Sequence, residues 1–214
     1  MNRYARQFKA GNAEMQLYYS RNSPFARVVR VAAIECGLAP RIDHVEVVNR
    51  DPDSPLLAFS PVCRVPTLVD GTLVIGEARN ICAYFDHLVG EPTFLAGSQA
   101  SWSGLAFESM ALGFLDATGV WVRENRREKH QVSDFIMQVE HQRANRCLDD
   151  FETKLSSQTD ASIAWDFAGL AVACAIGVLD HNELLSGWRA TRPKLALWYE
   201  ENASRASMCD TQPR

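Results

Sequence analysis

The sequence predicts two packed domains, a small α/β domain over residues 15–90 and an all-helical domain over residues 98–205. Short runs typical of strands and helices alternate in the first part, and strand-like runs vanish from Ser98 onward. Between the two parts, Gly90-Glu91-Pro92 has the composition of a linker. A series of β and α elements followed by helices alone is typical of two domains in one chain.

The composition is that of an ordinary globular protein. The chain has 214 residues, of which 47% are hydrophobic and 22% charged, and its formal charge is -4. This mild acidity argues against a nucleic-acid or anionic-membrane partner, because either needs a basic patch. No apolar run approaches the ~20 residues of a membrane span. We therefore expect neither nucleic acid nor a membrane as a partner.

The ends of the chain and the cysteines bear on location. Residues 1–14 lack the apolar segment of a secretory signal, and we expect them to be a disordered extension. Residues 206–214 are expected to form an irregular tail. The six cysteines show neither a C-x-x-C motif nor zinc-ligand spacing. We therefore expect a cytoplasmic, reducing location and no metal site.

The α/β domain is predicted to begin with a strand at Met15–Tyr19, followed by a turn-forming loop. A helix is predicted over Phe25–Leu38, where apolar residues recur at helical spacing. Ser23 is a suitable N-cap for it, and Pro24 suits a first helical position. A second strand is predicted at Ile42–Val48, where apolar and polar residues alternate.

A hairpin is predicted in the second half of this domain. Two strand-like runs, Thr67–Val69 and Leu73–Ile75, flank Asp70-Gly71, which is a strong hairpin signal. Gly76-Glu77-Ala78 then opens a helix that is expected to end near Val89. The resulting order, β-α-β followed by β-β-α, is a thioredoxin-like layout.

The second domain is predicted to consist of helices only. One of them is apolar almost all round, which indicates a buried central helix, and Asp166 is its predicted N-cap. The helices are expected at Ser101–Glu128, Asp134–Leu155, Phe167–Leu179, His181–Ser186 and Pro193–Asn202.

Three short motifs resemble those of the cytosolic glutathione transferase family: Ser23-Pro24-Phe25, Arg64-Val65-Pro66 and Glu77-Ala78. The first is similar to the catalytic loop of serine-type members such as the tau class, and zeta-like members place their Ser in a neighbouring position. The buried helix and Arg205-Ala206-Ser207-Met208 also resemble segments of bacterial members. The resemblance covers roughly residues 15–210 and implies a thioredoxin-like glutathione-binding domain followed by a helical domain.

The resemblance implies that Ser23 is catalytic and that its hydroxyl bonds the thiolate of glutathione. A free thiol has a pKa of ~8.5 and only the thiolate attacks, so the sulfur needs a hydrogen-bond donor. Ser in place of Cys favours thiolate stabilisation over disulfide exchange. The alternative is that Ser23 is only an N-cap, and Ser20 and Asn22 are then the remaining donors in this loop.

The resemblance also implies the residues that bind glutathione. Val65 would bond the cysteinyl part through its backbone, and Pro66 would be cis, or else simply start a strand. Arg64 would reach the glycine carboxylate. Glu77 would bind the γ-glutamyl ammonium, and the N–H of Ala78 its carboxylate. The family usually has Ser at position 78, and losing that bond to a charged group, ~1.5–3 kcal/mol, would lower affinity about tenfold unless another group substitutes.

The pocket for the second substrate is expected between the first loop and the long helix that starts near Ser101. Aromatic residues and Met suit varied apolar ligands, although aromatic residues at helical spacing also form cores. Cys63, where many members have Gly, is either an inert neighbour or a redox-sensitive thiol. The expected pocket residues are Phe25, Phe107, Met110 and Phe114.

The implied function is a glutathione transferase of the kind used in detoxification, which attacks a largely apolar electrophile by conjugation or by reductive cleavage of an ether or halide. Members are usually homodimers. The alternative is a non-catalytic binding or regulatory protein of the stringent starvation protein A type, which the Ala at position 78 favours. A disulfide reductase working through Cys63 is a third reading, opposed by the position of that cysteine away from a helix start.

Overall fold

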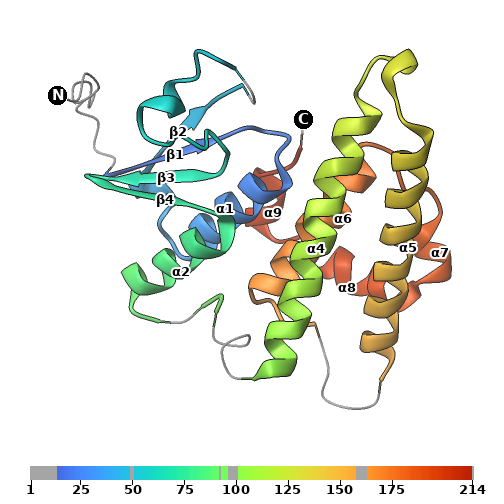
Figure 1. The fold of residues 1–214 in the computed structure, drawn as a ribbon. Coiled ribbons are helices and arrows are strands. Elements are labelled where there is room, and N and C mark those ends of the chain that lie inside the picture. Colours follow the sequence, from blue (N-terminus) through green and yellow to red (C-terminus); the bar gives the residue numbers. More distant parts are fainter. Residues whose placement is uncertain (1–13, 49–50, 92, 96–100, 158–162, 214) are drawn as a thin grey trace.

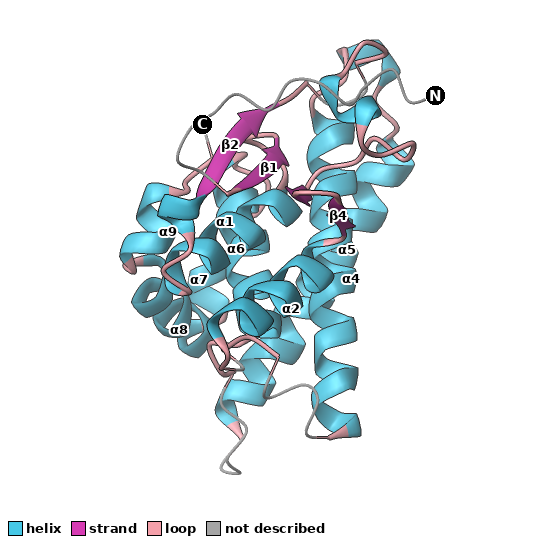
Figure 2. Cartoon of the chain, turned by 90° about the vertical axis from the view of Figure 1, so that its left-hand side faces the viewer, coloured by secondary structure: helices cyan, strands magenta, loops and turns pink. Residues whose placement is uncertain are grey.

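The computed structural model describes residues 14–48, 51–91, 93–95, 101–157 and 163–213. In this part of the chain an α/β domain and a helical domain lie side by side, and the described strands all belong to the first (Figures 1 and 2). The predicted fold class, a thioredoxin-like domain followed by an all-helical domain, is therefore confirmed.

The α/β domain is built around a four-stranded mixed sheet. Its described elements are β1 (Met15–Tyr19), α1 (Pro24–Glu35), η1 (Ala39–Arg41), β2 (Ile42–Glu46), η2 (Pro55–Ala58), β3 (Thr67–Asp70), β4 (Leu73–Gly76) and α2 (Ala78–Val89), where η marks a 3-10 helix. The strand order is β2-β1-β3-β4. β1 and β2 are parallel, whereas β3 is antiparallel to both β1 and β4.

The start of α1 follows directly from its first residues. The Ser23 Oγ accepts the N–H of Ala26 at 3.2 Å, and Pro24 occupies the first helical position, as predicted. Proline lacks an N–H, so it leaves no unpaired donor in this first turn. The sequence therefore fixes where α1 begins and which loop precedes it.

Two elements of this domain end earlier than predicted. α1 ends at Glu35 rather than Leu38, because Gly37 adopts φ 67° and the Leu38 N–H turns back to the Ala33 carbonyl at 2.8 Å. This left-handed glycine at the end of a helix closes the helix by a local bond. β2 likewise ends at Glu46.

The hairpin between β3 and β4 forms with its turn shifted by one residue. Asp70 pairs with Leu73, so the loop consists of Gly71 and Thr72. Gly71 has φ 57°, a conformation that favours glycine. The hairpin prediction is therefore right in kind, although Asp70 is the last strand residue.

The two faces of the sheet are covered differently. Leu17 and Leu68 face α1 and α2 and join the main hydrophobic core. Tyr18 and Val69 face the opposite way and pack with Leu56 of η2. Successive residues of a strand point to opposite faces, so this alternation buries both sides of the central strands.

The helical domain begins with two long helices. Within the described residues it contains α4 (Trp102–Asn125), α5 (Asp134–Ser156), α6 (Phe167–His181), α7 (Trp188–Thr191), α8 (Pro193–Ala203) and α9 (Ala206–Asp210), with one short 3-10 turn, η3 (Lys129–Gln131). By length and composition alone α4 could cross a membrane, as the core helices of other proteins also could. In the structure 44% of its most apolar 18-residue window is buried inside the protein.

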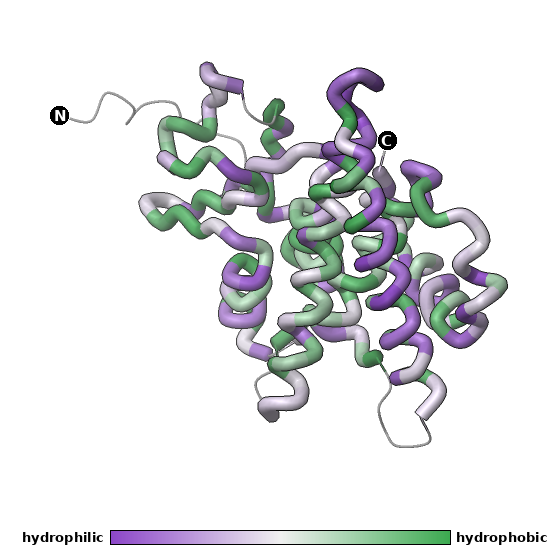
Figure 3. The backbone as a smooth tube through the Cα atoms, turned by 45° about the vertical axis from the view of Figure 1, so that its right-hand side comes forward, coloured by the Kyte–Doolittle hydropathy of each residue, from purple (hydrophilic) through white to green (hydrophobic). Residues whose placement is uncertain are grey.

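α6 is the buried central helix that the sequence predicts. Every residue from Phe167 to Leu179 is buried, and the helix packs against α1, α4 and α8. Hydrophobic residues gather around it, whereas α5 and the turn joining α4 to α5 are largely hydrophilic (Figure 3). A Cβ at Gly177 would lie 2.3 Å from the Arg27 Nη1 of α1, so any larger residue here would displace the Arg27 side chain.

A buried carboxylate holds the connection between the domains. Asp86 of α2 accepts the backbone N–H groups of Thr93, Phe94 and Leu95, the first at 3.0 Å and the last at 2.9 Å. The Phe94 carbonyl in turn accepts the N–H of Phe167, the first residue of α6, at 3.0 Å. The segment of residues 93–95, which connects the two domains, is therefore hydrogen-bonded to both of them.

Two expectations near the C-terminus are wrong. No separate helix forms over His181–Ser186, because α6 continues to His181 and the chain then turns at Glu183, which has φ 55°. The expected irregular tail instead contains α9. The Arg205 guanidinium and the Ser207 hydroxyl bond Glu35 of α1 at 3.2 and 2.5 Å, so partners far away in sequence stabilise this short helix.

Most of the expected N-terminal extension, residues 1–13, lies outside the described residues. Glu14 is ordered at its edge, where its N–H donates to the Arg41 carbonyl at 3.1 Å. Its carboxylate also pairs with the Arg41 guanidinium.

We predict that Gly169→Ala lowers the free energy of unfolding by about 2 kcal/mol or more, because overpacking a buried backbone contact forces it apart. A Cβ at Gly169 would lie 2.0 Å from the Ala164 carbonyl oxygen. The control is Gly113→Ala in α4, where a Cβ meets nothing within 4 Å and stability should rise by up to about 1 kcal/mol. Urea denaturation followed by circular dichroism checks both, and equal stabilities of the two variants would contradict the packing described here.

Candidate functional site

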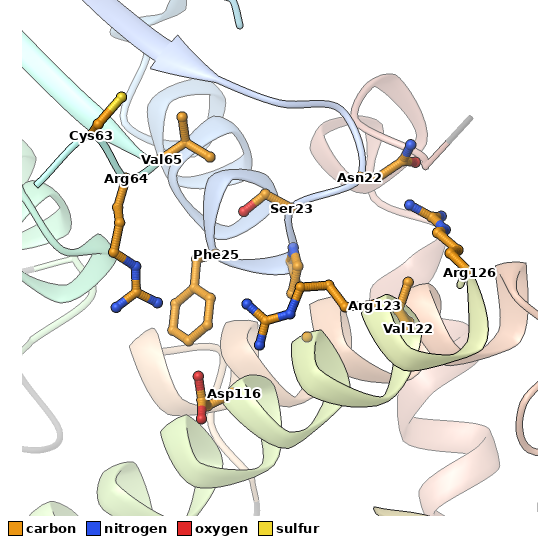
Figure 4. A pocket seen from close by; sticks show the side chains of 12 residues that line it. Asn22, Ser23, Phe25, Cys63, Arg64, Val65, Asp116, Val122, Arg123 and Arg126 are labelled. Atoms are coloured by element: carbon orange, nitrogen blue, oxygen red, sulfur yellow. The ribbon is translucent and has the colours of Figure 1, made fainter. Parts of the chain in front are cut away.

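A cavity lies where the α/β domain meets α4. Its volume is about 190 Å³, and its walls come from the loop before α1, the segment before β3 and one face of α4. Figure 4 shows Ser23, Phe25 and Arg64 on one side, with Asp116 and Arg123 of α4 on the other. The lining residues are Asn22, Ser23, Pro24, Phe25, Cys63, Arg64, Val65, Asp116, Gly119, Val122, Arg123 and Arg126.

A second hollow of about 440 Å³ adjoins the first and shares Phe25, Arg64 and Val65 with it. It runs between the start of β3 and the start of α2. Six residues predicted from sequence to bind or activate a ligand therefore line these two neighbouring hollows: Ser23, Arg64, Val65, Pro66, Glu77 and Ala78.

Ser23 caps α1 with its hydroxyl as a hydrogen-bond acceptor. Its Oγ accepts the N–H of Ala26, and its own N–H donates to the Ser20 carbonyl at 3.1 Å. A hydroxyl can accept with its lone pairs while its hydrogen points elsewhere. Its role as an N-cap is thus compatible with donation into the cavity.

The two remaining donors of the first loop differ in position. Asn22 lines the cavity, and its buried Oδ1 has no hydrogen-bond partner among the described residues. Ser20 is absent from the described lining of either hollow, and its carbonyl bonds Ser23. Asn22 is therefore the better placed of the two to contact a ligand.

The segment before β3 offers backbone groups to the two hollows, which together are called the groove below. The Val65–Pro66 peptide bond is cis, as the resemblance implied. The Arg64 carbonyl accepts the Thr67 hydroxyl at 2.7 Å. No backbone hydrogen bond described in the structure uses the N–H or carbonyl of Val65. These two groups can therefore pair with an extended peptide-like ligand.

The start of α2 is open toward the second hollow. Glu77 occupies the N-cap position without a side-chain capping bond, so the first N–H groups of α2 lack the usual side-chain acceptor. Such a helix start attracts a carboxylate. Glu77 has φ 64°, which costs a residue other than glycine roughly 1–3 kcal/mol. Its exposed carboxylate lies beside the open helix start and can bind a cation there.

One face of α4 forms the opposite wall. Asp116, Gly119, Arg123 and Arg126 recur at helical spacing, and all four line the first cavity. A Cβ at Gly119 would lie 3.8 Å from the Pro24 ring, so α4 passes close to the loop that carries Ser23.

The expected apolar pocket residues are only partly brought together. Phe25 lines both hollows. Phe107 and Phe114 instead pack edge-on against Phe151 of α5, at ring-centre distances of 6.0 and 5.5 Å. Met110 packs against the main core. Because this face of α4 meets α5 and α6, these three residues lie away from the described walls of either hollow.

Cys63 lines the first cavity and is half-buried, with φ 49°. Burial raises the pKa of four other thiols: to about 11 for Cys36 and Cys174, well above the ordinary value for Cys82, and above the ordinary value for Cys147. Within the described residues, no group of three or more His, Cys, Asp or Glu could hold a metal ion.

Sequence reasoning missed the charged wall and Asn80. Asn80 lines the second hollow near the start of α2. The recurrence of Asp116, Arg123 and Arg126 along α4 could have indicated a charged stripe. Which side of a long helix faces the other domain is nevertheless a matter of packing between distant segments.

Comparison with known proteins agrees with this geometry. Residues 17–93 match the family model of the glutathione S-transferase N-terminal domain. The uncharacterized GST-like protein YibF of Escherichia coli (strain K12) is 29% identical over 202 residues, which cover 93% of this chain and 98% of that protein.

Two solved structures are similar along nearly the whole chain. A glutathione S-transferase from Methylobacillus flagellatus with glutathione bound has a TM-score of 0.78 and 28% identity, covering 94% of this chain and 100% of that one. A glutathione transferase family member from Pseudomonas fluorescens Pf-5, also with bound glutathione, has a TM-score of 0.78 and 29% identity, covering 94% and 99%. The fold is that of the glutathione S-transferases, and the likenesses support a member of that family.

We predict that Glu77→Gly raises the free energy of unfolding by about 1 kcal/mol, because glycine relieves the positive φ at this position. Glu77→Ala removes the same carboxylate but keeps the strain, so its stability should stay at or below that of the parent. Urea denaturation of the three proteins provides the comparison. Equal stabilities of the Gly and Ala variants would argue against a strained backbone at the start of α2.

Proposed function

We propose that the protein binds glutathione in the two hollows and that Ser23 stabilises the thiolate for attack on an electrophile. The observation that carries this proposal is that the Ser23 hydroxyl lines the cavity and accepts the bond that caps α1, so its hydrogen would be available to a thiolate. The two related structures with bound glutathione support the choice of ligand.

The groups around the groove match the three parts of glutathione. The N–H and carbonyl of Val65 would pair with the cysteinyl residue and hold its sulfur near Ser23. Arg64 would bind the glycine carboxylate, and it has no ion-pair partner among the described residues. The start of α2 would take the γ-glutamyl carboxylate, with Glu77 binding the neighbouring ammonium.

Ala78 leaves the carboxylate subsite without a hydroxyl. Its side chain is buried, but the N–H groups at the start of α2 do not depend on side-chain identity. Asn80 lies in the same hollow and carries an amide that can donate the missing bond. We therefore propose that the departure from the usual Ser weakens the site without removing it.

The proposed reaction is conjugation or reductive cleavage. In conjugation, the sulfur forms a bond to an electrophilic carbon, and a leaving group departs or a multiple bond takes up the proton. In reductive cleavage of a halide or ether, two glutathione molecules supply the electrons and become a disulfide. Ser23 would lower the pKa of the attacking thiol by donating to the thiolate. We also propose a cytoplasmic homodimer, as is usual for the family that the sequence resembles.

Calorimetric titration with reduced glutathione tests the site. We expect the parent protein to bind and Glu77→Ala to bind about 10- to 100-fold more weakly, because a hydrogen bond to a charged group is lost. Glu91→Ala, a like change at an exposed residue outside both hollows, is the matched control and should bind as the parent does.

Absence of binding by the parent protein would overturn the proposal. It would favour the non-catalytic binding or regulatory protein, because Ala78 would then have removed the ligand site. Equal affinities of the parent and Glu77→Ala would remove Glu77 from the proposed site.

A further inference from the structure

The first cavity carries more positive charge than a pocket for a purely apolar substrate needs. Arg64, Arg123 and Arg126 line the first cavity, and Asp116 is the carboxylate among its described lining residues. Arg64 belongs to the proposed glutathione subsite. Arg123 of α4 and Arg126, the C-cap residue of that helix, therefore remain for the second substrate.

Arg123 is available to a ligand. Its side chain is exposed, and no ion pair or hydrogen bond of this guanidinium is found among the described residues. The neighbouring acid Glu124 is buried and already pairs with Arg127 at 3.4 Å and with the Ser133 N–H at 2.7 Å. Glu124 lines a neighbouring hollow together with Arg123, but its carboxylate is already bound by Arg127 and the Ser133 N–H, and it forms no ion pair with Arg123 among the described residues.

Arg126 adds charge at the far end of the same wall. Its Nη2 donates to the Asn182 side-chain oxygen at 3.0 Å. That amide is neutral, so it orients Arg126 without cancelling its charge. Asp116 lies about two turns away from Arg123 on the same face of α4, near Phe25 (Figure 4).

The cavity is small, and part of its lining is apolar. Pro24, Phe25 and Val122 supply hydrophobic surface between Ser23 and the arginines. A volume of about 190 Å³ is below the ~300–1,000 Å³ typical of pockets for drug-sized ligands. The cavity therefore fits a compact electrophile that has an apolar body and an anionic end.

We propose that the second substrate carries a carboxylate or similar anionic group, bound by Arg123 with Arg126 adding positive charge. This inference rests on the proposed function, since it assigns the partner of the glutathione thiolate. A guanidinium recognises a carboxylate through two parallel hydrogen bonds, which orients the substrate as well as binding it. The reactive carbon would then lie between Arg123 and Ser23.

A chloronitrobenzoate is an example of such a substrate, and its conjugation with glutathione proceeds by substitution. The glutathione sulfur forms a bond to the ring carbon that carries chlorine, the carbon–chlorine bond breaks, chloride leaves, and the thiol proton passes to solvent. No oxidant or further co-reactant takes part. The carboxylate stays unchanged and remains available to Arg123 in both substrate and product.

The test uses the two thioether products, so it does not depend on turnover. S-(4-carboxy-2-nitrophenyl)glutathione and its 4-carbamoyl analogue differ by a carboxylate against a neutral amide of nearly the same shape. Each is titrated calorimetrically, beside reduced glutathione, into the full chain and into Arg123→Gln, Arg123→Lys and Arg127→Gln. Arg127→Gln removes the same charge just beyond the C-terminal end of α4 and outside the first cavity.

We expect the parent protein and Arg127→Gln to bind the carboxylate at least about tenfold more tightly than the amide, because a charge-assisted bond is made only with the former. Arg123→Gln should lower this ratio to about one. Arg123→Lys keeps the charge without the planar fork, and it should retain part of the preference.

Equal binding of the two products by the parent, or an unchanged ratio in Arg123→Gln, would overturn the assignment. If Arg123→Gln weakened reduced glutathione and both products alike, Arg123 would belong to the glutathione subsite, and the assignment would also fail. If the parent bound neither glutathione nor either product, the proposed function itself would fail. Binding of glutathione with a ratio of one would refute only the substrate class.

Discussion

The buried helix α6 is the constraint on which the rest of the structure depends. It packs against α1 on one side and α4 on another, and these two helices carry opposite walls of the first cavity. Gly177 leaves room for Arg27 of α1, and the Phe94 carbonyl binds the first residue of α6. The distance between Ser23 and the arginines of α4 is therefore set by hydrophobic packing deep in the molecule, because a close-packed interior transmits displacement.

Helix starts supply both proposed ligand-binding ends of the groove. α1 begins at Ser23, whose side chain caps the helix, whereas α2 begins at Glu77 without a capping side chain. In the proposed function, one start would offer a hydroxyl proton to a sulfur, and the other would offer backbone N–H groups to a carboxylate. Two described non-glycine residues with positive φ, Cys63 and Glu77, line the groove. Strain concentrated at one place is typical of functional sites.

Local signals made much of this predictable from the sequence. The cap and proline fix the start of α1, and the short runs around Gly71 fix the hairpin, since each depends on residues close in the chain. α9 could not be predicted, because Glu35 and Arg27 of α1 hold it from the other end of the sequence. The residues that line the pocket could not be predicted correctly for a similar reason. Phe107 fits any apolar helix face, and only the packing of α4 against α5 shows that it faces Phe151.

The central claim is that Ser23 stabilises a thiolate, and an absorbance titration of bound glutathione tests it most directly. The absorbance of the thiolate is followed against pH. A reference sample with S-methylglutathione bound allows the absorbance of the protein's own cysteines to be subtracted. Cys36 and Cys174, with pKa values of about 11, contribute little to it near neutral pH. We expect the thiol of bound glutathione to have a pKa at least about one unit below the ~8.5 of a free thiol. In Ser23→Gly this pKa should return toward that value. Glycine is chosen because replacing an N-cap residue by glycine lowers the stability of the helix by only a few tenths of a kcal/mol. Ser133→Ala, at the cap of α5, should leave the pKa lowered. A bound thiol with an ordinary pKa in the parent protein would contradict the account.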